Sequence, residues 1–441
     1  MSTALTGKPL KDFFSRASVE RLSGKLGDPD WLKEKRLEAW KVWEAGAADP
    51  ALSGTRFLRR MGEVHSLELD PGEAVPLPAS FKPSLESDWG SLSGCLSFGC
   101  EENLEPALDP ALAPRGVVFC SLREALKGHG ELVKKHLFSR TRVDETAWAA
   151  LHAAYLSQGC FLYVPKGVKL EKPFRVLGAH TAGHAGFFPH TLAVLEEGAE
   201  ATLVDELHSA TPRAGLAAQV SELVLGAGAQ LNYVHFQNLN LSSVQVLRQR
   251  TNLGRDSYLY TLELAAGSAL STSYLESLVD GEGGRVDLLG LVLAGKDQQI
   301  EIRTLQDHRG RAGSSDALVK SILREEARFY FDGVVKIHKT GQNTNAFQSN
   351  PNLLLSTRCK AETVPTLEIE ADDVACKHAA SIGSIDEEER FYLLSRGINE
   401  SDTENMIVEG FAAELAQRLP NEGLQEKFVE ILNRLSRRHA G

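Results

Sequence analysis

Two side chains near the end of the chain have the types that metal ions prefer. In the segment ADDVACKHAAS, Cys376 and His378 are separated by a single residue. Residues two apart on a β-strand share a face, so a thiol and an imidazole would be presented together. Thiolate and imidazole are ligands for iron, zinc and copper(I). Because free cysteine is often buried and Val374 shares this face, spacing alone favours a core position over a metal site.

A third candidate ligand is Cys359, in the segment LLLSTRCKAETVP. It lies 17 residues before Cys376, a separation short enough for a neighbouring strand. Cys359 would complete a thiolate and imidazole cluster if the three side chains converge. The alternative is an ordinary thiol, which spacing slightly favours, and spacing leaves the convergence open.

Three histidines, His180, His184 and His190, lie in GAHTAGHAGFFPH. An H-x-x-x-H pair binds metal when a helix brings the two rings together, but glycine and proline interrupt this stretch and no Glu follows the first histidine. We therefore predict a loop without a metal. The glycine-rich segment 280–284 lacks the residues of a phosphate-binding loop, so no nucleotide site is predicted.

Paired carboxylates are the catalytic groups of glycosidases. Two acidic pairs, Glu196 with Glu197 and Asp372 with Asp373, are more simply explained as solvated turn residues. A carbohydrate-active enzyme would use carboxylates on an exposed strand face, for which the candidates are Asp205, Glu206 and Glu301. Such enzymes are commonly secreted, and the N-terminus MSTALTGKPLKDFF has no secretory signal pattern, so this alternative ranks low.

The elements that position these residues are predicted from periodicity. After Gly159, apolar and polar residues alternate with a period of two for more than 200 residues, as in YLYTLEL at 258–264. This alternation indicates strand after strand with one buried side. Similar strand pairs recur at intervals of about thirty residues, as Gly198 and Gly228 illustrate. The pattern predicts a right-handed parallel β-helix, in preference to an antiparallel sandwich with tighter turns.

Helical patterns flank this region on both sides. We predict a mostly helical N-terminal domain at 1–157, a β-helix core at 158–383 and a helical C-terminal domain at 384–441. A proline-rich stretch at 70–83 predicts an extended connector. Three Ser-x-x-Glu capping boxes, beginning at Ser121, Ser384 and Ser401, each predict a helix start.

Composition excludes several classes of protein. The chain has 441 residues, of which 42% are hydrophobic, as expected of a folded globular protein. Lys and Arg number 48 against 59 Asp and Glu, a net charge of −11 that argues against nucleic-acid binding. No apolar stretch is long enough for a membrane helix, and we expect a cytoplasmic protein. The six cysteines, without a C-x-x-C pair, are expected to be free thiols.

Two long segments resemble a known family. They are DETAWAALHAAYLSQGCFLYVPKGVKLEKP, at 144–173, and LLLSTRCKAETVPTLEIEADDVACKHAASIGSIDEEERFYLLSRGI, at 353–398. Both are similar to the SufB/SufD family of iron–sulfur cluster assembly proteins, over about the C-terminal two thirds of the chain. The run ADDVACKHAASIG followed by FYLLSRGI, together with WLKEKRLEAW near the N-terminus, is more similar to the SufD branch than to the SufB branch.

The resemblance implies a non-catalytic scaffold subunit with helical domains around a right-handed parallel β-helix. It implies a complex with a SufB-like protein, bound through the β-helix edge, and with two copies of a SufC-like ATPase, docked on the region from Ser384 onward. The edge-to-edge pairing would cover a terminal strand. An isolated chain could instead pair with itself. Neither a nucleic acid nor a membrane is an expected partner.

The resemblance also gives the candidate ligands a role. His378 is the histidine of the family's C-x-H motif and would help to hold a nascent cluster at the interface with SufB. Cys376 and Cys359 are further candidates for transient iron or cluster ligands, and no stably bound cofactor is expected in the isolated chain. Cys359 lies where the SufB branch carries its scaffold cysteine, in a similar C-x-A-x-T-x-P setting. An alternative function is therefore a SufB-type principal scaffold that acts through Cys359.

Overall fold

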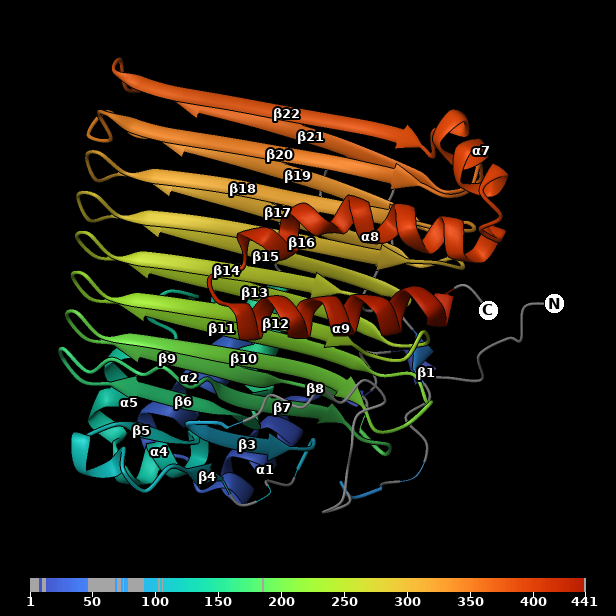
Figure 1. Ribbon diagram of the computed structural model, residues 1–441. Helices are drawn as coiled ribbons and strands as arrows, with labels where there is room; N and C mark the ends of the chain where they lie inside the picture. The colour runs from blue at the N-terminus through green and yellow to red at the C-terminus, as the bar shows by residue number, and fades with distance from the viewer. Residues whose placement is uncertain are drawn as a thin grey trace.

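The fold is a β-solenoid made of two stacked sheets, with helices at one end and across one face (Figure 1). The computed structural model describes residues 8–9, 13–46, 68–69, 73, 75–77, 91–101, 104, 106–184 and 186–439. Successive strands of the stack alternate between the sheets and pair in parallel, so the antiparallel sandwich is wrong. The predicted fold class, a mainly β parallel β-helix flanked by helices, is confirmed.

Each sheet has ten strands. In sheet 1 the order is β22 (Val374–Ser384), β20 (Thr344–Leu354), β18 (Ser314–Leu323), β16 (Arg285–Ala294), β14 (Tyr258–Ala265), β12 (Gln230–Asn238), β10 (Glu200–Ser209), β7 (Phe174–His180), β3 (Gly94–Phe98) and β4 (Ala107–Leu108). In sheet 2 the order is β21 (Lys360–Ile369), β19 (Arg328–Ile337), β17 (Gln299–His308), β15 (Leu270–Val279), β13 (Val244–Leu253), β11 (Leu216–Leu225), β9 (Pro189–Leu195), β6 (Gln158–Val164) and β5 (Val118–Ser121), with β8 (Gly186–Phe187) beside β11. A separate pair joins β1 (Lys8–Pro9) to β2 (Glu68–Leu69).

The registers explain the repeat seen in the sequence. Glu200 of β10 pairs with Gln230 of β12, and from β6 and β7 onward the spacing of paired residues ranges from 26, for Val244 and Leu270, to 32, for Arg328 and Lys360. Gly198 and Gly228 stand at equivalent turns, with φ of +67° and +65°. Glycine suits these turns because a left-handed backbone conformation is unfavourable for other residues.

Alternation along the strands fills the space between the sheets. Inward-facing apolar residues form one continuous core, with Leu231, Leu259, Ile300 and Phe331 all fully buried. Stacking at about 4.8 Å places equivalent residues of successive rungs in contact, so the core runs along the whole stack.

The N-terminal helices pack against the lower part of sheet 2, as the lower part of Figure 1 shows. They are α1 (Arg16–Leu26), α2 (Asp30–Glu44), α4 (Leu122–Gly128), α5 (Gly130–His136) and α6 (Ala147–Tyr155), with a short 3-10 helix, η4 (Ala113–Arg115). The Ser121 capping box is confirmed, because its hydroxyl accepts a hydrogen bond from the N–H of Glu124 while the Glu124 carboxylate accepts one from Ser121.

Three helices follow the solenoid: α7 (Glu387–Ser395), α8 (Glu400–Arg418) and α9 (Glu422–His439). In Figure 1, α8 and α9 lie across the outer face of sheet 1, and α7 lies at the end of β22. The capping box predicted at Ser384 is wrong, because β22 extends to that residue and Asp386 caps α7 instead. The one predicted at Ser401 is also wrong, because α8 already begins at Glu400 and Asn399 caps it.

The predicted domain boundaries at 157/158 and 383/384 stay predictions. Most of the proline-rich stretch at 70–83 lies outside the described residues. Among the residues that the structure does describe, no helix is both long and apolar enough to cross a membrane.

Candidate functional site

The candidate ligands lie on or beside the last rung of the solenoid, which consists of β21 and β22. Within the described chain, β21 pairs only with β19 and β22 only with β20, so each strand has one open edge. Exposed apolar side chains occur on these strands, and Ile382 of β22 is 47% exposed. An open parallel edge presents unpaired N–H and C=O groups that another chain can bind.

Cys376 and His378 both lie on β22, so the prediction that they share one strand face is confirmed by the secondary structure. Cys376 stands beside Ala346 of β20, and His378 stands beside Gln348. Cys376 is half-buried in a small apolar cluster, and this burial raises the pKa of its thiol. His378 is exposed to solvent, which leaves its imidazole accessible.

Cys359 lies in the turn between β20 and β21 and is only 5% exposed. Its thiol donates to the carbonyl oxygen of Ser356 at 2.9 Å and is 3.5 Å from that of Leu323. One wall of a cavity of about 350 Å³ contains this cysteine. The solenoid side of this cavity therefore includes a buried, hydrogen-bonded thiol.

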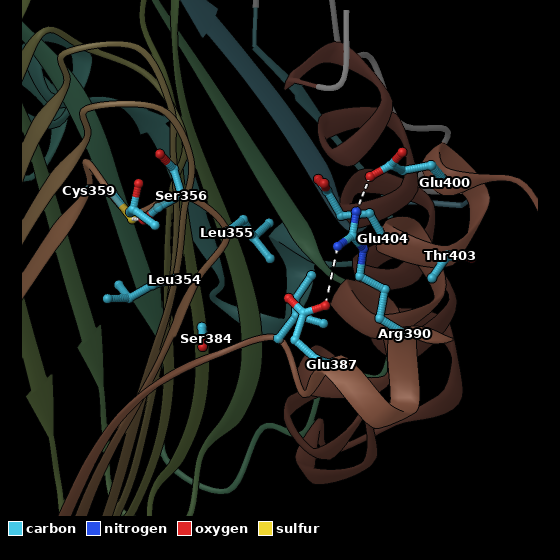
Figure 2. A pocket seen from close by; sticks show the side chains of 12 residues that line it. Leu354, Leu355, Ser356, Cys359, Ser384, Glu387, Arg390, Glu400, Thr403 and Glu404 are labelled. Carbon is cyan, nitrogen blue, oxygen red and sulfur yellow. Dashed lines mark hydrogen bonds and ion pairs between the residues drawn. The ribbon is translucent and has the colours of Figure 1, made fainter. Parts of the chain in front are cut away.

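Helices α7 and α8 form the opposite wall of that cavity, as Figure 2 shows. Arg390 of α7 stands between two carboxylates, Glu387 on its own helix and Glu400 on α8, and forms an ion pair with each. Glu404 of α8 also lines the cavity and pairs with Arg324 of the solenoid. Sequence analysis missed these groups, because no local pattern brings α7 and α8 beside the turn that carries Cys359.

The structure separates Cys359 from the C-x-H pair. Ser384, at the end of β22, lines the same cavity as Cys359. Cys376 comes eight residues earlier on that strand, which corresponds to about 26 Å at 3.3 Å per residue. Across the described residues, no group of three or more Cys, His, Asp or Glu side chains could hold a metal ion. The convergence that the sequence left open is not found within this chain.

The histidines at 180–190 are placed by strands rather than by one loop. His180 ends β7 and His190 lies in β9, so the loop prediction is wrong for these two residues. Burial lowers the pKa of His180 to about 4, and its Nε2 is 2.9 Å from the carbonyl oxygen of His184. His190 is buried, with Nε2 3.2 Å from Glu222. Both rings are therefore packed parts of the core.

The carboxylates weighed for a glycosidase do not face one another. Asp205 points between the sheets, where it accepts hydrogen bonds from Thr191 and Tyr233. Glu206, its neighbour in β10, points to the other side and pairs with Arg175. Glu301 lies in sheet 2, so the three do not form the carboxylate pair that a glycosidase requires.

Comparison with known proteins gives this arrangement a family. Residues 177–411 match the family model described as SUF system FeS cluster assembly, SufBD core domain, and residues 84–176 match the SufBD protein N-terminal region. The chain belongs to the SufBD family. The resemblance found in the sequence is therefore confirmed, and the matched core includes Cys359, Cys376 and His378.

Individual members of the SufBD family match over most of the chain. The iron–sulfur cluster assembly protein SufD of Bacillus subtilis is 32% identical over 334 residues, which cover 74% of this chain and 76% of that protein. SufBD family proteins of Staphylococcus aureus and Staphylococcus haemolyticus are 25% identical over 419 residues, which cover 92% of this chain and 89% of each relative. This chain is thus a SufBD family protein of iron–sulfur cluster assembly, with similarity to SufD.

Proposed function

We propose that this chain is a SufD-like, non-catalytic scaffold subunit that pairs with a SufB-like protein and docks a SufC-like ATPase. The observation that carries the proposal is the open edge of the last rung, on the strand that bears His378, in a chain similar to SufD. Iron and the nascent cluster are the cargo of this site.

The β22 edge supports pairing with a second solenoid. A strand added to it would continue sheet 1 and hydrogen-bond the backbone groups that β20 leaves free. Pairing there would bring side chains of the partner beside His378, which lies on that strand. A site shared between two chains would also supply the further ligands that the described residues of one chain lack.

Helix α7 supports docking of the ATPase. Its Phe391 is 72% exposed and Tyr392 is 56% exposed, and three glutamates occupy its first turn. Exposed aromatic side chains are the residues that most often contribute strongly to protein interfaces. Because α7 directly follows β22, a partner bound to α7 is connected by two residues to the strand that carries His378.

Cys376 and His378 would bind iron as thiolate and neutral imidazole. Burial raises the pKa of Cys376, so its thiol stays protonated until iron displaces the proton. Because protons compete with iron for both ligands, loading should weaken as the pH falls. Iron binding to the assembled complex, measured with wild type and His378→Ala, tests this role, and equal loading of the two proteins would contradict it.

Complex formation tests the proposal as a whole. The chain is co-expressed with SufB-like and SufC-like proteins, and the mass of the product is measured by size exclusion with light scattering. We expect one copy of this chain, one SufB-like protein and two ATPases. The variant Ile382→Glu should block pairing at the β22 edge, while Val429→Glu, on an exposed site of α9, serves as the control. A chain that elutes alone beside both partners would overturn the proposal.

The second candidate function, a SufB-type principal scaffold, is favoured by the thiol of Cys359 on the cavity wall. Cluster formation by this chain without a SufB-like partner, abolished by Cys359→Ser and retained by Cys95→Ser, would support that function instead.

A further inference from the structure

Another cavity, of about 260 Å³, lies at the N-terminal end of the solenoid, away from the last rung. It is lined by helix α1, the residues that follow β3, helix α4, the end of α6 and the segment around β8. Of the described residues that line it, none belongs to β22 or α7, on which the proposed function rests. Small-molecule sites are concave and commonly lie where several elements meet, so this cavity is a candidate ligand site.

One part of the cavity lining is aromatic. The ring centroid of Phe14 lies 4.6 Å from that of Tyr155 and 5.8 Å from that of Phe188. The Tyr155 hydroxyl already has partners, because it lies 2.6 Å from the Ser18 hydroxyl and accepts a hydrogen bond from a backbone N–H. Gly186 makes room for Phe188, since a Cβ at this position would overlap its ring. These rings therefore offer a ligand apolar faces and edges.

The cavity also contains an arginine whose charge is poorly compensated. Arg123 of α4 is half-buried, and its Nε donates to the carbonyl oxygen of Ser157 at 2.9 Å. Among the described residues, neither terminal nitrogen of Arg123 forms a hydrogen bond or an ion pair. Burial lowers the pKa of Arg123, and the attraction of Glu101 offsets this only in part. An anion in the cavity would supply the missing partner, and a carboxylate matches two parallel N–H donors.

Three further charged or titratable groups line the cavity, and they limit the charge that a ligand can carry. The Lys25 ammonium lies 2.6 Å from the Glu101 carboxylate, and Nδ1 of His184 lies 4.0 Å from it. The hydrogen bond from Lys25 lowers the pKa of Glu101, so this carboxylate stays ionised. Since Lys25 and Glu101 balance each other, the positive charge of Arg123 remains. Glu101 would repel a dianion more strongly than a monoanion.

We propose that this cavity binds a small aromatic monocarboxylate, with its ring against Phe14 and Phe188 and its carboxylate on the terminal nitrogens of Arg123. The site lies at the opposite end of the solenoid from the candidate cluster ligands and requires no partner protein. A ligand bound there contacts α1, α4 and the segment around β8 together. Because it binds only the folded chain, it stabilises the packing of these helices on the solenoid.

The test uses the full-length isolated chain with 4-fluorobenzoate, whose binding is measured from its fluorine NMR line width. We expect saturable binding with a dissociation constant of roughly 0.1–1 mM, as is usual for so small a ligand. The neutral isostere 4-fluorobenzamide should bind at least roughly tenfold more weakly, because it cannot accept charge-assisted hydrogen bonds from Arg123. No saturable binding of 4-fluorobenzoate, or equal binding of the two compounds, would overturn the proposal.

Charge variants locate the bound 4-fluorobenzoate. Arg123→Gln should weaken its binding by roughly tenfold or more, because the guanidinium donors are lost. Glu101→Gln should tighten binding by roughly twofold to fivefold, because a repelling carboxylate is removed. Arg21→Gln is the matched control, since Arg21 is exposed on α1 and does not line the cavity, and it should leave the affinity unchanged. An unchanged affinity in Arg123→Gln would place the ligand elsewhere and disprove the site.

A fourth variant tests the cavity without changing its charge, because Arg123→Gln also removes the hydrogen bond to Ser157. Leu22 is half-buried on α1 and lines the cavity, so Leu22→Trp should fill the space and abolish binding of 4-fluorobenzoate. Urea denaturation verifies that the variant is folded. Wild-type affinity in folded Leu22→Trp would also overturn the inference. None of these measurements uses a SufB-like or SufC-like protein, so a failed ligand site is distinguishable from a failed assembly.

Discussion

The two ends of the solenoid are built in opposite ways. At the N-terminal end, sheet 1 finishes with the antiparallel strand β4 and sheet 2 with the antiparallel strand β5. Helices α1, α2, α4, α5 and α6 then share a buried core with the adjoining rungs. At the C-terminal end, β21 and β22 keep open edges in the described chain, and α7 buries no residue. The edge strands β4 and β5 at this N-terminal, or closed, end have only two and four residues, whereas β21 and β22 at the open end have 10 and 11. Because a long unpaired edge is an aggregation hazard and a very short one is not, this difference supports the proposed pairing at the C-terminal end.

The closed end should be far more sensitive to mutation, and one buried ion pair tests this. The Arg36 and Asp28 side chains are 2% and 3% exposed, and Arg36 also donates to the carbonyl oxygen of Ala154. Arg36→Ala leaves a buried carboxylate without its partner and should lower the free energy of unfolding by about 3–5 kcal/mol. Urea denaturation measures the change. The matched truncation at the open end, Ile382→Ala, should cost less than about 1 kcal/mol, and equal losses would remove the contrast.

The open end should matter most for binding. Phe391→Ala removes an exposed aromatic side chain and should weaken binding of the SufC-like ATPase by about 2 kcal/mol, or roughly thirtyfold. Calorimetry with the purified ATPase measures the affinity. Urea denaturation of the same variant should match wild type, since Phe391 contributes little to the core. A stable variant with full ATPase affinity would place the docking surface elsewhere.

A buried polar cluster midway between the two ends should make stability depend on pH. Although burial by itself lowers the pKa of His235, the Glu263 carboxylate, 2.6 Å from its Nδ1, raises that pKa overall. The Nε2 of the same ring is 3.1 Å from Oε1 of Gln219, whose amide donates to Asp205. Burial raises the pKa of Asp205.

A raised folded-state pKa of His235 stabilises the fold fully below the ordinary value of about 6.5, and this stabilisation is lost as the pH rises through the folded-state pKa. The difference in free energy of unfolding between wild type and His235→Gln should therefore shrink as the pH rises from about 6. The expected decrease is about 1.4 kcal/mol for each unit by which the pKa of His235 is shifted. If the difference in free energy of unfolding between the two proteins stays constant up to pH 9, the imidazole of His235 is neutral throughout and this prediction is wrong.

The smallest effect is expected at the exposed pair of Arg358 and Glu326, beside the open end. Their side chains are 67% and 60% exposed, so Arg358→Ala should change the free energy of unfolding by less than about 0.5 kcal/mol. Chemical denaturation at low and at high salt checks this value. A larger, salt-dependent loss would mean that surface charge stabilises the last rung, and the contrast between the ends would be weaker.

Several features of this protein were determined by the sequence alone. The alternation of apolar and polar residues and the spacing of about thirty residues predict the solenoid, because side-chain direction along a strand and the length of one coil are local properties. The C-x-H pair shares a face for the same reason. The Ser121 capping box was also predictable, since its hydrogen bonds join residues three apart.

Tertiary structure decided the rest. Cys359 and Cys376 are 17 residues apart in sequence yet lie near opposite ends of the last rung, because β21 and the turn after it carry the chain across the solenoid and β22 carries it back. The cavity beside Cys359 depends on α7 and α8, and α8 is positioned by packing against sheet 1 rather than by any residue near Cys359 in the sequence. Ser384 shows the same limit, because strand pairing with β20 extends β22 to this residue and overrides its local capping pattern.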